Sequence, residues 1–134
     1  QALVNSGAVR SHHEAFGRLI GDGMAAHVPT SMMDPIEAIT LIRNAGGLAV
    51  WAHPPLDLLP QILTELVREG LHGLEVFRPR SRPDDIMLLE QQAERRGLIR
   101  TGGSDWHGPN RGSRLGDFFV ESEEVADFLE AGGL

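Results

Sequence analysis

Three side chains that can bind a metal ion follow apolar runs predicted to be buried strands. His53 comes directly after residues 48–52, and Asp105 and His107 come shortly after the run 98–101. Asp105 and His107 are two apart in predicted extended or loop backbone, so both can point to the same side and chelate a divalent ion. Because the carboxyl ends of parallel strands meet at one rim, the three side chains are expected to converge there.

Each of these residues also has a simpler interpretation. A single histidine at a strand end is typically bonded to a loop carbonyl, and that is the alternative for His53. The pattern Asp-x-His is short and occurs by chance in many chains. The coincidence of His53 with Asp105 and His107 at the ends of two strands is what favours a shared site.

A carboxylate and several arginines accompany these residues. Glu75 lies in the apolar run 71–77, where a buried carboxylate is unfavourable unless it faces an arginine or a metal. Arg78, Arg80 and Arg82 follow it. They either bind phosphate as a local cluster or form a solvated turn before the next helix, and the residues alone leave both interpretations open.

The elements that must position these residues alternate along the chain. Strands are predicted at 48–52, 71–77 and 98–101, with a weaker one at 118–120, because these runs are short, apolar and rich in branched or aromatic residues. Capping residues and apolar periodicity predict helices over 11–21, 34–46, 57–70, 81–97 and 122–131. The alternation is typical of an α/β fold with a parallel sheet, either a small open sheet or the C-terminal part of a βα barrel.

Composition narrows the classes of function. The chain has 134 residues, enough for one domain, with 12 basic residues that are all arginine, 19 acidic residues and a formal net charge of -7. This balance disfavours binding of duplex nucleic acid, and the absence of cysteine excludes disulfides and thiolate metal sites. The sequence has no long apolar run and no signal-peptide pattern, so it predicts a cytoplasmic protein with no membrane span.

Three segments together resemble a known family. Residues 46–54 (GGLAVWAHP), 73–76 (GLEV) and 102–108 (GGSDWHG) are similar to motifs of the polymerase and histidinol phosphatase (PHP) family of metal-dependent phosphoesterases. Residues 14–29 resemble an insertion found in nucleotide phosphatases and related nucleases of that family. The resemblance covers nearly the whole chain.

The resemblance implies a distorted seven-stranded βα barrel with two or three manganese, zinc or iron ions at its C-terminal rim. It implies that His53, Asp105 and His107 are metal ligands and that Glu75 supports them without binding metal. The implied reaction is attack of metal-activated water on a small phosphorylated substrate, such as a nucleotide or an oligonucleotide end. Arg78 and Arg80 are the candidates for holding the phosphate.

The chain also departs from the family pattern. The opening His-x-His motif, the following acidic ligand and the histidine of a Gly-Arg-Pro-His-like motif are absent, and residues 78–81 replace a segment that often contains histidine. We therefore expect residues 1–134 to be the C-terminal part of a single PHP-type domain. Self-association or an N-terminal segment is expected to complete the barrel. The alternatives are a non-catalytic α/β module or inactive fragment that retains part of the metal site, and a different metallohydrolase such as an amidase.

Overall fold

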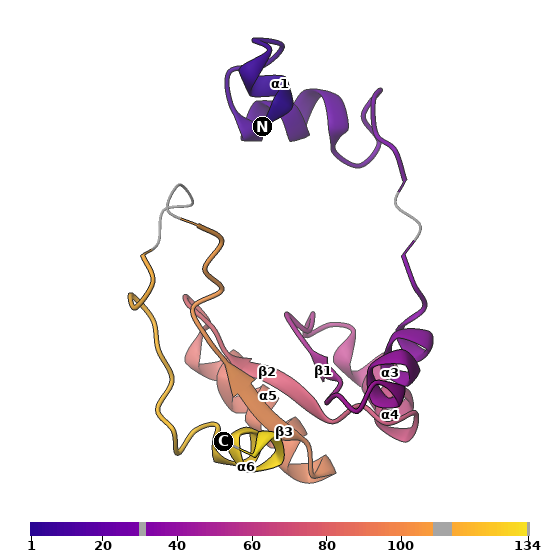
Figure 1. Ribbon diagram of the computed structural model, residues 1–134, viewed down its shortest axis with the longest axis vertical. Helices are drawn as coiled ribbons and strands as arrows, with labels where there is room; N and C mark the ends of the chain where they lie inside the picture. Colours follow the sequence, from indigo (N-terminus) through magenta and orange to yellow (C-terminus); the bar gives the residue numbers. More distant parts are fainter. Residues whose placement is uncertain (30–31, 109–113, 134) are drawn as a thin grey trace. The chain divides into compact units, whose positions relative to one another are not determined.

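A computed structural model describes residues 1–29, 32–108 and 114–133, and most of its elements are labelled in Figure 1. The chain divides into two compact units, residues 1–33 and residues 34–134. The candidate site lies entirely in the second unit.

The first unit contains short helices built around a capping box. They are α1 (Ala2–Asn5), α2 (His12–Ala15) and the π-helix η1 (Phe16–Ile20). The Glu14 backbone N–H donates to Ser11 Oγ at 3.1 Å, and the Glu14 carboxylate accepts the Arg10 backbone N–H at 2.8 Å. This arrangement confirms a helix start at Ser11. The wider π-turn that continues the helix was not predicted.

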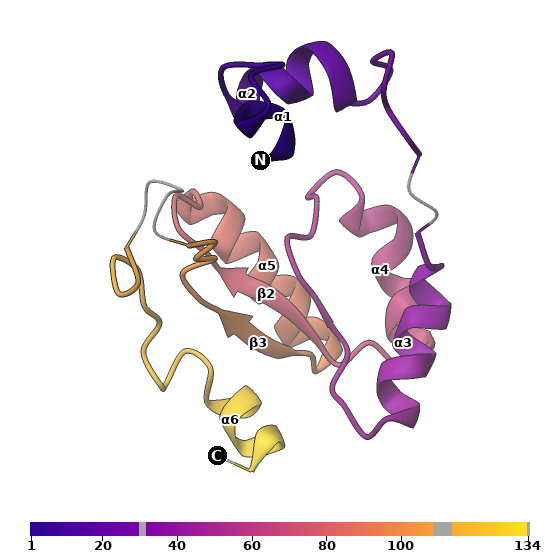
Figure 2. The ribbon, with the colours of Figure 1, turned by 45° about the horizontal axis from the view of Figure 1, so that its top comes forward.

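The second unit is built on a three-stranded parallel sheet in the order β1-β2-β3. The strands are β1 (Val50–Trp51), β2 (Gly73–Phe77) and β3 (Ile99–Gly102). The connections contain α4 (Leu59–Arg68) and α5 (Pro83–Arg96), and α5 packs along β2 and β3 (Figure 2). This confirms a mixed α/β fold with a parallel sheet whose three strands all end at the same edge.

The helices begin and end at the residues that local chemistry favours. α3 (Pro35–Asn44) begins after Asp34, whose Oδ1 accepts the backbone N–H of Ile36 at 2.9 Å. α5 ends at Gly97, which adopts φ +63°. Glycine favours this left-handed turn because it has no Cβ. The last helix, α6 (Ala126–Gly132), contacts β3.

The core lies on one face of the central strand. Leu74 and Val76 are fully buried, and they alternate with Glu75, whose side chain therefore points to the opposite face. Buried residues of α4 and α5, Leu63 and Leu89 among them, belong to the same cluster. Strand β2 thus has one apolar face in the core and one face that presents a carboxylate.

Two predicted strands differ from the structure. The first strand has two residues rather than five, and the segment 118–120 is not a strand. Val120 instead packs its side chain at the end of β3, where a Cβ built on Gly102 would lie 3.0 Å from its Cγ1. In α3 only Ile39 is buried, whereas Ile42 is 39% exposed. None of the helices in the described ranges is long and apolar enough to cross a membrane.

Candidate metal and anion site

His53 and Asp105 come from different strand ends and meet at one edge of the sheet. One residue separates His53 from the end of β1, and two residues separate Asp105 from the end of β3. Their side chains approach to 3.3 Å between His53 Nε2 and Asp105 Oδ1. Both side chains are partly exposed, so this pair is accessible to a ligand. The structure therefore brings together the first two of the three predicted metal-binding residues.

Glu75 contacts His53 from the middle of β2. Its Oε2 accepts the His53 backbone N–H at 2.9 Å and lies 3.6 Å from His53 Nε2. The same oxygen lies 3.8 Å from Arg78 Nε. The Glu75 carboxylate thus faces both an arginine and a predicted metal ligand, which accounts for its place in an otherwise apolar strand.

His107 is oriented by its own loop. Its Nδ1 lies 2.6 Å from the Asp105 carbonyl oxygen and 3.6 Å from Asp105 Oδ1. Since a carbonyl only accepts hydrogen bonds, Nδ1 is the donor, and in a neutral ring the lone pair is on Nε2. Metal-binding histidines commonly donate their second ring nitrogen to a carbonyl in this way.

The donor atoms suit a divalent ion in type and in spacing. Two ligands of one tetrahedral ion with bonds of about 2.1 Å lie roughly 3.4 Å apart. The 3.3 Å between His53 Nε2 and Asp105 Oδ1 matches that separation. Within the ranges that the structure describes, no three His, Asp or Glu side chains converge as a complete metal-binding group. The chain therefore shows a fitting pair of donors, with His107 nearby but turned toward its own loop.

Strained backbone marks three of the predicted site residues. Outside glycine, positive φ angles in the described part of the chain occur at His53 (+50°), Arg80 (+65°) and Asp105 (+48°). This left-handed conformation is unfavourable for residues with a Cβ, less so for Asp and His than for Arg. Such strain concentrates at functional sites, where the surrounding structure maintains it. The sequence had singled out all three residues for their chemistry alone.

A cleft of about 700 Å³ lies beside these residues. It is lined by His53, Arg78, Pro79, Arg80, Ser104, Asp105, His107, Arg114, Asp117 and Phe118. Three arginines and two histidines face two aspartates there, although the whole chain carries a net charge of -7. The cleft is thus a local exception in an acidic protein, and its composition favours an anion.

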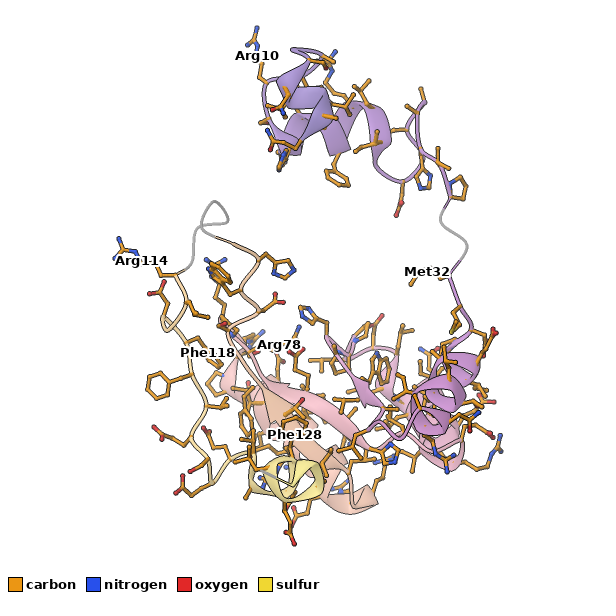
Figure 3. The ribbon with its side chains drawn as sticks, viewed as in Figure 1. Arg10, Met32, Arg78, Arg114, Phe118 and Phe128 are labelled. Atoms are coloured by element: carbon orange, nitrogen blue, oxygen red, sulfur yellow. The ribbon has the colours of Figure 1, made fainter. Side chains whose placement is uncertain are left out.

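The arginines of the cleft differ in their surroundings. Arg78, Arg114 and Phe118 all line it, and the end of the Arg114 side chain extends outward from the ribbon (Figure 3). The Arg78 Nε is buried and, among the described residues, has no hydrogen-bond partner. Arg82, predicted as part of the cluster, does not line the cleft and lies 3.9 Å from Asp84.

Besides Pro79, which stands between two predicted arginines, sequence reasoning missed four of the lining residues, namely Ser104, Arg114, Asp117 and Phe118. Ser104 lies inside the motif at residues 102–108, so its position next to Asp105 could have identified it. No pattern marked the other three as site residues, because none of them follows a predicted strand end. Their place in the site depends on the tertiary fold.

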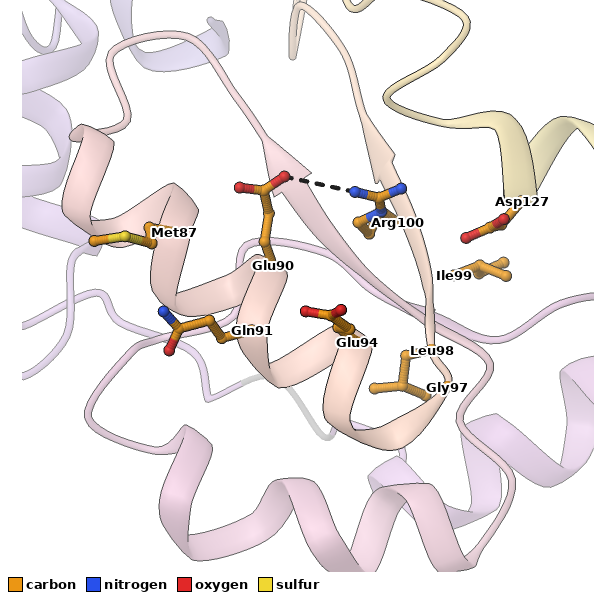
Figure 4. A pocket seen from close by; sticks show the side chains of 9 residues that line it. All are labelled: Met87, Glu90, Gln91, Glu94, Gly97, Leu98, Ile99, Arg100 and Asp127. Carbon is orange, nitrogen blue, oxygen red and sulfur yellow. Dashed lines mark ion pairs between the residues drawn. The ribbon is translucent and has the colours of Figure 1, made fainter.

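A second groove, of about 670 Å³, lies at the amino end of β3 between α5 and α6 (Figure 4). Glu90 and Arg100 form an ion pair there at 3.6 Å. Its other polar side chains are mostly carboxylates, and none of its lining residues is a histidine. The groove is therefore chemically unlike the cleft at the carboxyl ends of the strands.

Comparison with known proteins finds relatives that are named as enzymes of phosphate-ester hydrolysis. The chain is 32% identical to the 3',5'-nucleoside bisphosphate phosphatase of Chromobacterium violaceum over 117 residues, which are 84% of this chain and 41% of that protein. It is 41% identical over 80 residues to the phosphoribosyl 1,2-cyclic phosphate 1,2-diphosphodiesterase of Eggerthella lenta, covering 57% of this chain and 29% of the relative. No family model matches the chain.

A solved structure agrees with these relatives. A Bifidobacterium adolescentis protein assigned as a metal-dependent phosphoesterase matches with a TM-score of 0.77 at 30% identity, covering 97% of this chain and 48% of that one. The chain thus spans less than half the length of each of these relatives. These relatives support the predicted resemblance to the PHP-type family: in sequence and in fold, the chain is similar to part of a metal-dependent phosphoesterase.

Proposed function

We propose that this chain contributes metal and substrate contacts to a hydrolase that cleaves phosphate esters of small molecules. The observation that carries the proposal is the meeting of His53 and Asp105 at 3.3 Å beside a cleft that also contains arginines. The relatives named phosphatase and diphosphodiesterase support the same reaction class. A nucleotide or an oligonucleotide end is the substrate that we favour.

The metal would be held by His53 Nε2, Asp105 Oδ1 and the free Nε2 of His107. Manganese, zinc and iron all accept this set of imidazole and carboxylate donors, and we propose two or three such ions in the complete site. A bound ion of this kind lowers the pKa of a coordinated water and neutralises charge on phosphate oxygens. Because Asp105 contacts both histidines, its loss is expected to weaken metal binding most.

The arginines would bind the phosphate. Arg78 and Arg80 follow β2 directly and line the cleft that contains the metal-binding pair. A guanidinium binds phosphate oxygens through paired, charge-assisted hydrogen bonds, and it is always charged at neutral pH. We infer that these two residues orient the phosphate, while His53, Asp105 and His107 hold the metal.

The larger architecture belongs to the same proposal. The order β1-β2-β3, with all strands parallel and helical connections between them, is that of a sector of a βα barrel. We propose that the chain forms the C-terminal part of a distorted seven-stranded barrel that further chain or a second copy completes. The proposal includes a cytoplasmic location, as the sequence predicted.

Metal binding tests the proposal most directly. Calorimetry with Mn²⁺ and Zn²⁺ would compare the wild-type chain with Asp105→Asn and with Asp117→Asn. Asp117 is a matched control because it lines the same cleft, where its carboxylate accepts the Arg114 backbone N–H at 2.7 Å. We expect Asp105→Asn to weaken binding by about tenfold or more, and Asp117→Asn to leave it unchanged.

Hydrolysis identifies the reaction. The same three proteins would be assayed with Mn²⁺ against a panel of phosphate esters and a panel of amides. Turnover of phosphate esters that requires Asp105 supports the proposal. Turnover of amides alone would favour the amidase alternative. If no metal binds and no ester is cleaved, the chain is instead a non-catalytic module or an inactive fragment.

A further inference from the structure

The backbone of His53 is held by a single side chain. His53 has φ +50°. Only one residue separates it from the end of β1, so extended backbone would be the natural continuation. Its N–H donates to Glu75 Oε2 at 2.9 Å. The left-handed conformation is uncommon for residues with a Cβ and persists where surrounding contacts maintain it. This hydrogen bond is such a contact.

Glu75 belongs to the central strand of the sheet. It lies at the centre of β2, between Leu74 and Val76, which are both fully buried, and it is in register with Thr101 of β3. Its side chain is 16% exposed. A group on a paired central strand is placed more precisely than a group on a loop, so Glu75 can fix the position of the looser residue.

Glu75 contacts both ends of His53. The oxygen that accepts the His53 backbone N–H also lies 3.6 Å from Nε2 of the His53 ring. That ring nitrogen is the atom that lies 3.3 Å from Asp105 Oδ1. The distance from Glu75 Oε2 to Arg78 Nε, 3.8 Å, is longer than a hydrogen bond. The hydrogen bond to the His53 backbone is therefore the shortest of these contacts of the oxygen.

We propose that Glu75 is a positioning residue, which holds His53 in its left-handed conformation through the backbone N–H and so directs the His53 ring toward Asp105. The effect of this positioning on catalysis rests on the proposed function. The geometry itself can be tested without any metal.

Amide hydrogen exchange measured by NMR tests the hydrogen bond. In the wild-type chain we expect the His53 amide to exchange about tenfold or more slowly than in an unstructured peptide, because charge-assisted hydrogen bonds are strong. Glu75→Ala should remove this protection. Glu75→Gln should retain most of it, since the amide oxygen of glutamine can still accept.

A control variant shows that the effect is local. Glu90→Ala removes a carboxylate that pairs with Arg100 in the second groove, and it should leave the His53 amide unchanged. Exchange of the His53 amide at the unstructured rate in the wild type overturns the proposal. Protection that survives in folded Glu75→Ala also overturns it. If the alanine variant does not fold, two other results test the proposal. Slow exchange of the His53 amide in the wild type and an upfield shift of its proton signal in Glu75→Gln support the hydrogen bond, and the absence of either contradicts it.

Mn²⁺ separates this proposal from the proposed function. Broadening of the Asp105 and His53 signals by Mn²⁺ should be weaker in Glu75→Ala than in Glu75→Gln, because only the glutamine retains the acceptor. If Mn²⁺ broadens no signal in the wild type while the exchange results hold, the metal-dependent function fails and the positioning role of Glu75 stands. Equal broadening in the two variants would contradict the role of Glu75 in directing the His53 ring.

Discussion

His72 and Ala49 are joined by hydrogen bonds in both directions. His72 Nδ1 accepts the backbone N–H of Ala49 at 3.0 Å, and the backbone N–H of His72 donates to the Ala49 carbonyl at 2.8 Å. The two residues immediately precede β1 and β2, so they extend the pairing of these strands toward their amino ends. Because β1 has only two residues, this pair supplies much of the attachment that positions His53.

The first prediction concerns this pair. His72→Phe leaves the Ala49 N–H without its acceptor and should lower the free energy of unfolding by about 1–3 kcal/mol. His72→Asn is the matched control, because its Oδ1 can accept in place of Nδ1. Urea unfolding of the two variants measures the difference. Equal stabilities would show that the ring nitrogen contributes nothing.

The second prediction separates backbone strain from anion binding at Arg80. Arg80→Gly removes the Cβ from a residue at φ +65°, so the free energy of unfolding should stay unchanged or rise by up to about 1 kcal/mol. Affinity for inorganic phosphate should fall about tenfold, because a charged hydrogen bond is lost. Arg82→Gly is the control, because Arg82 does not line the cleft. The phosphate affinity of this variant should match that of the wild type. Unchanged affinity in Arg80→Gly would remove Arg80 from the substrate site.

The third prediction concerns the end of β3. A Cβ added at Gly102 would lie 2.5 Å from both the Cβ and the carbonyl oxygen of Phe77, so Gly102→Ala must displace the backbone there. We expect a loss of about 1–3 kcal/mol in stability and a shift of the Asp105 amide signal in NMR spectra. Gly103→Ala meets no atom within 4 Å in the same comparison and should change neither quantity. Similar losses in both variants would show that space at Gly102 is not the cause.

The fourth prediction is a dependence on pH in the first unit. The backbone N–H of Arg10, followed by the Arg18 side chain, lowers the pKa of the Glu14 carboxyl below its usual value. A lowered pKa in the folded state means that the charged form stabilises the fold. This contribution is present above the usual carboxyl pKa and is lost as the pH falls through the lowered value. NMR signals of residues 12–20 should therefore show loss of helix in acid.

Glu14→Gln provides the control for this pH dependence. Glutamine cannot ionise, so its helical signals should start weaker at neutral pH and change less between neutral and acidic solution. An identical pH profile in the variant and the wild type would assign the loss of helix to other carboxylates.

The local sequence predicted the helices and strands because capping and periodicity are properties of neighbouring residues. Asp34 begins α3, Gly97 ends α5, the apolar run at 71–77 contains β2, and the run at 98–101 overlaps β3. The same patterns failed at 118–120, because an apolar segment becomes a strand only where a partner edge pairs with it. The backbone of that segment takes no part in the sheet, although Val120 packs there.

The sequence by itself determined which side chains could form the site, since residue type sets donor chemistry and strand ends set the rim. The tertiary structure alone decided how they meet. The register of β2 places Glu75 where its carboxylate reaches the backbone of His53, and the loop after β3 brings Asp105 to 3.3 Å from the His53 ring. The tertiary structure also turns the His107 ring toward the Asp105 carbonyl and places Phe118 in the lining of the cleft. Distances between residues far apart in the chain depend on register and loop conformation, which no local pattern encodes.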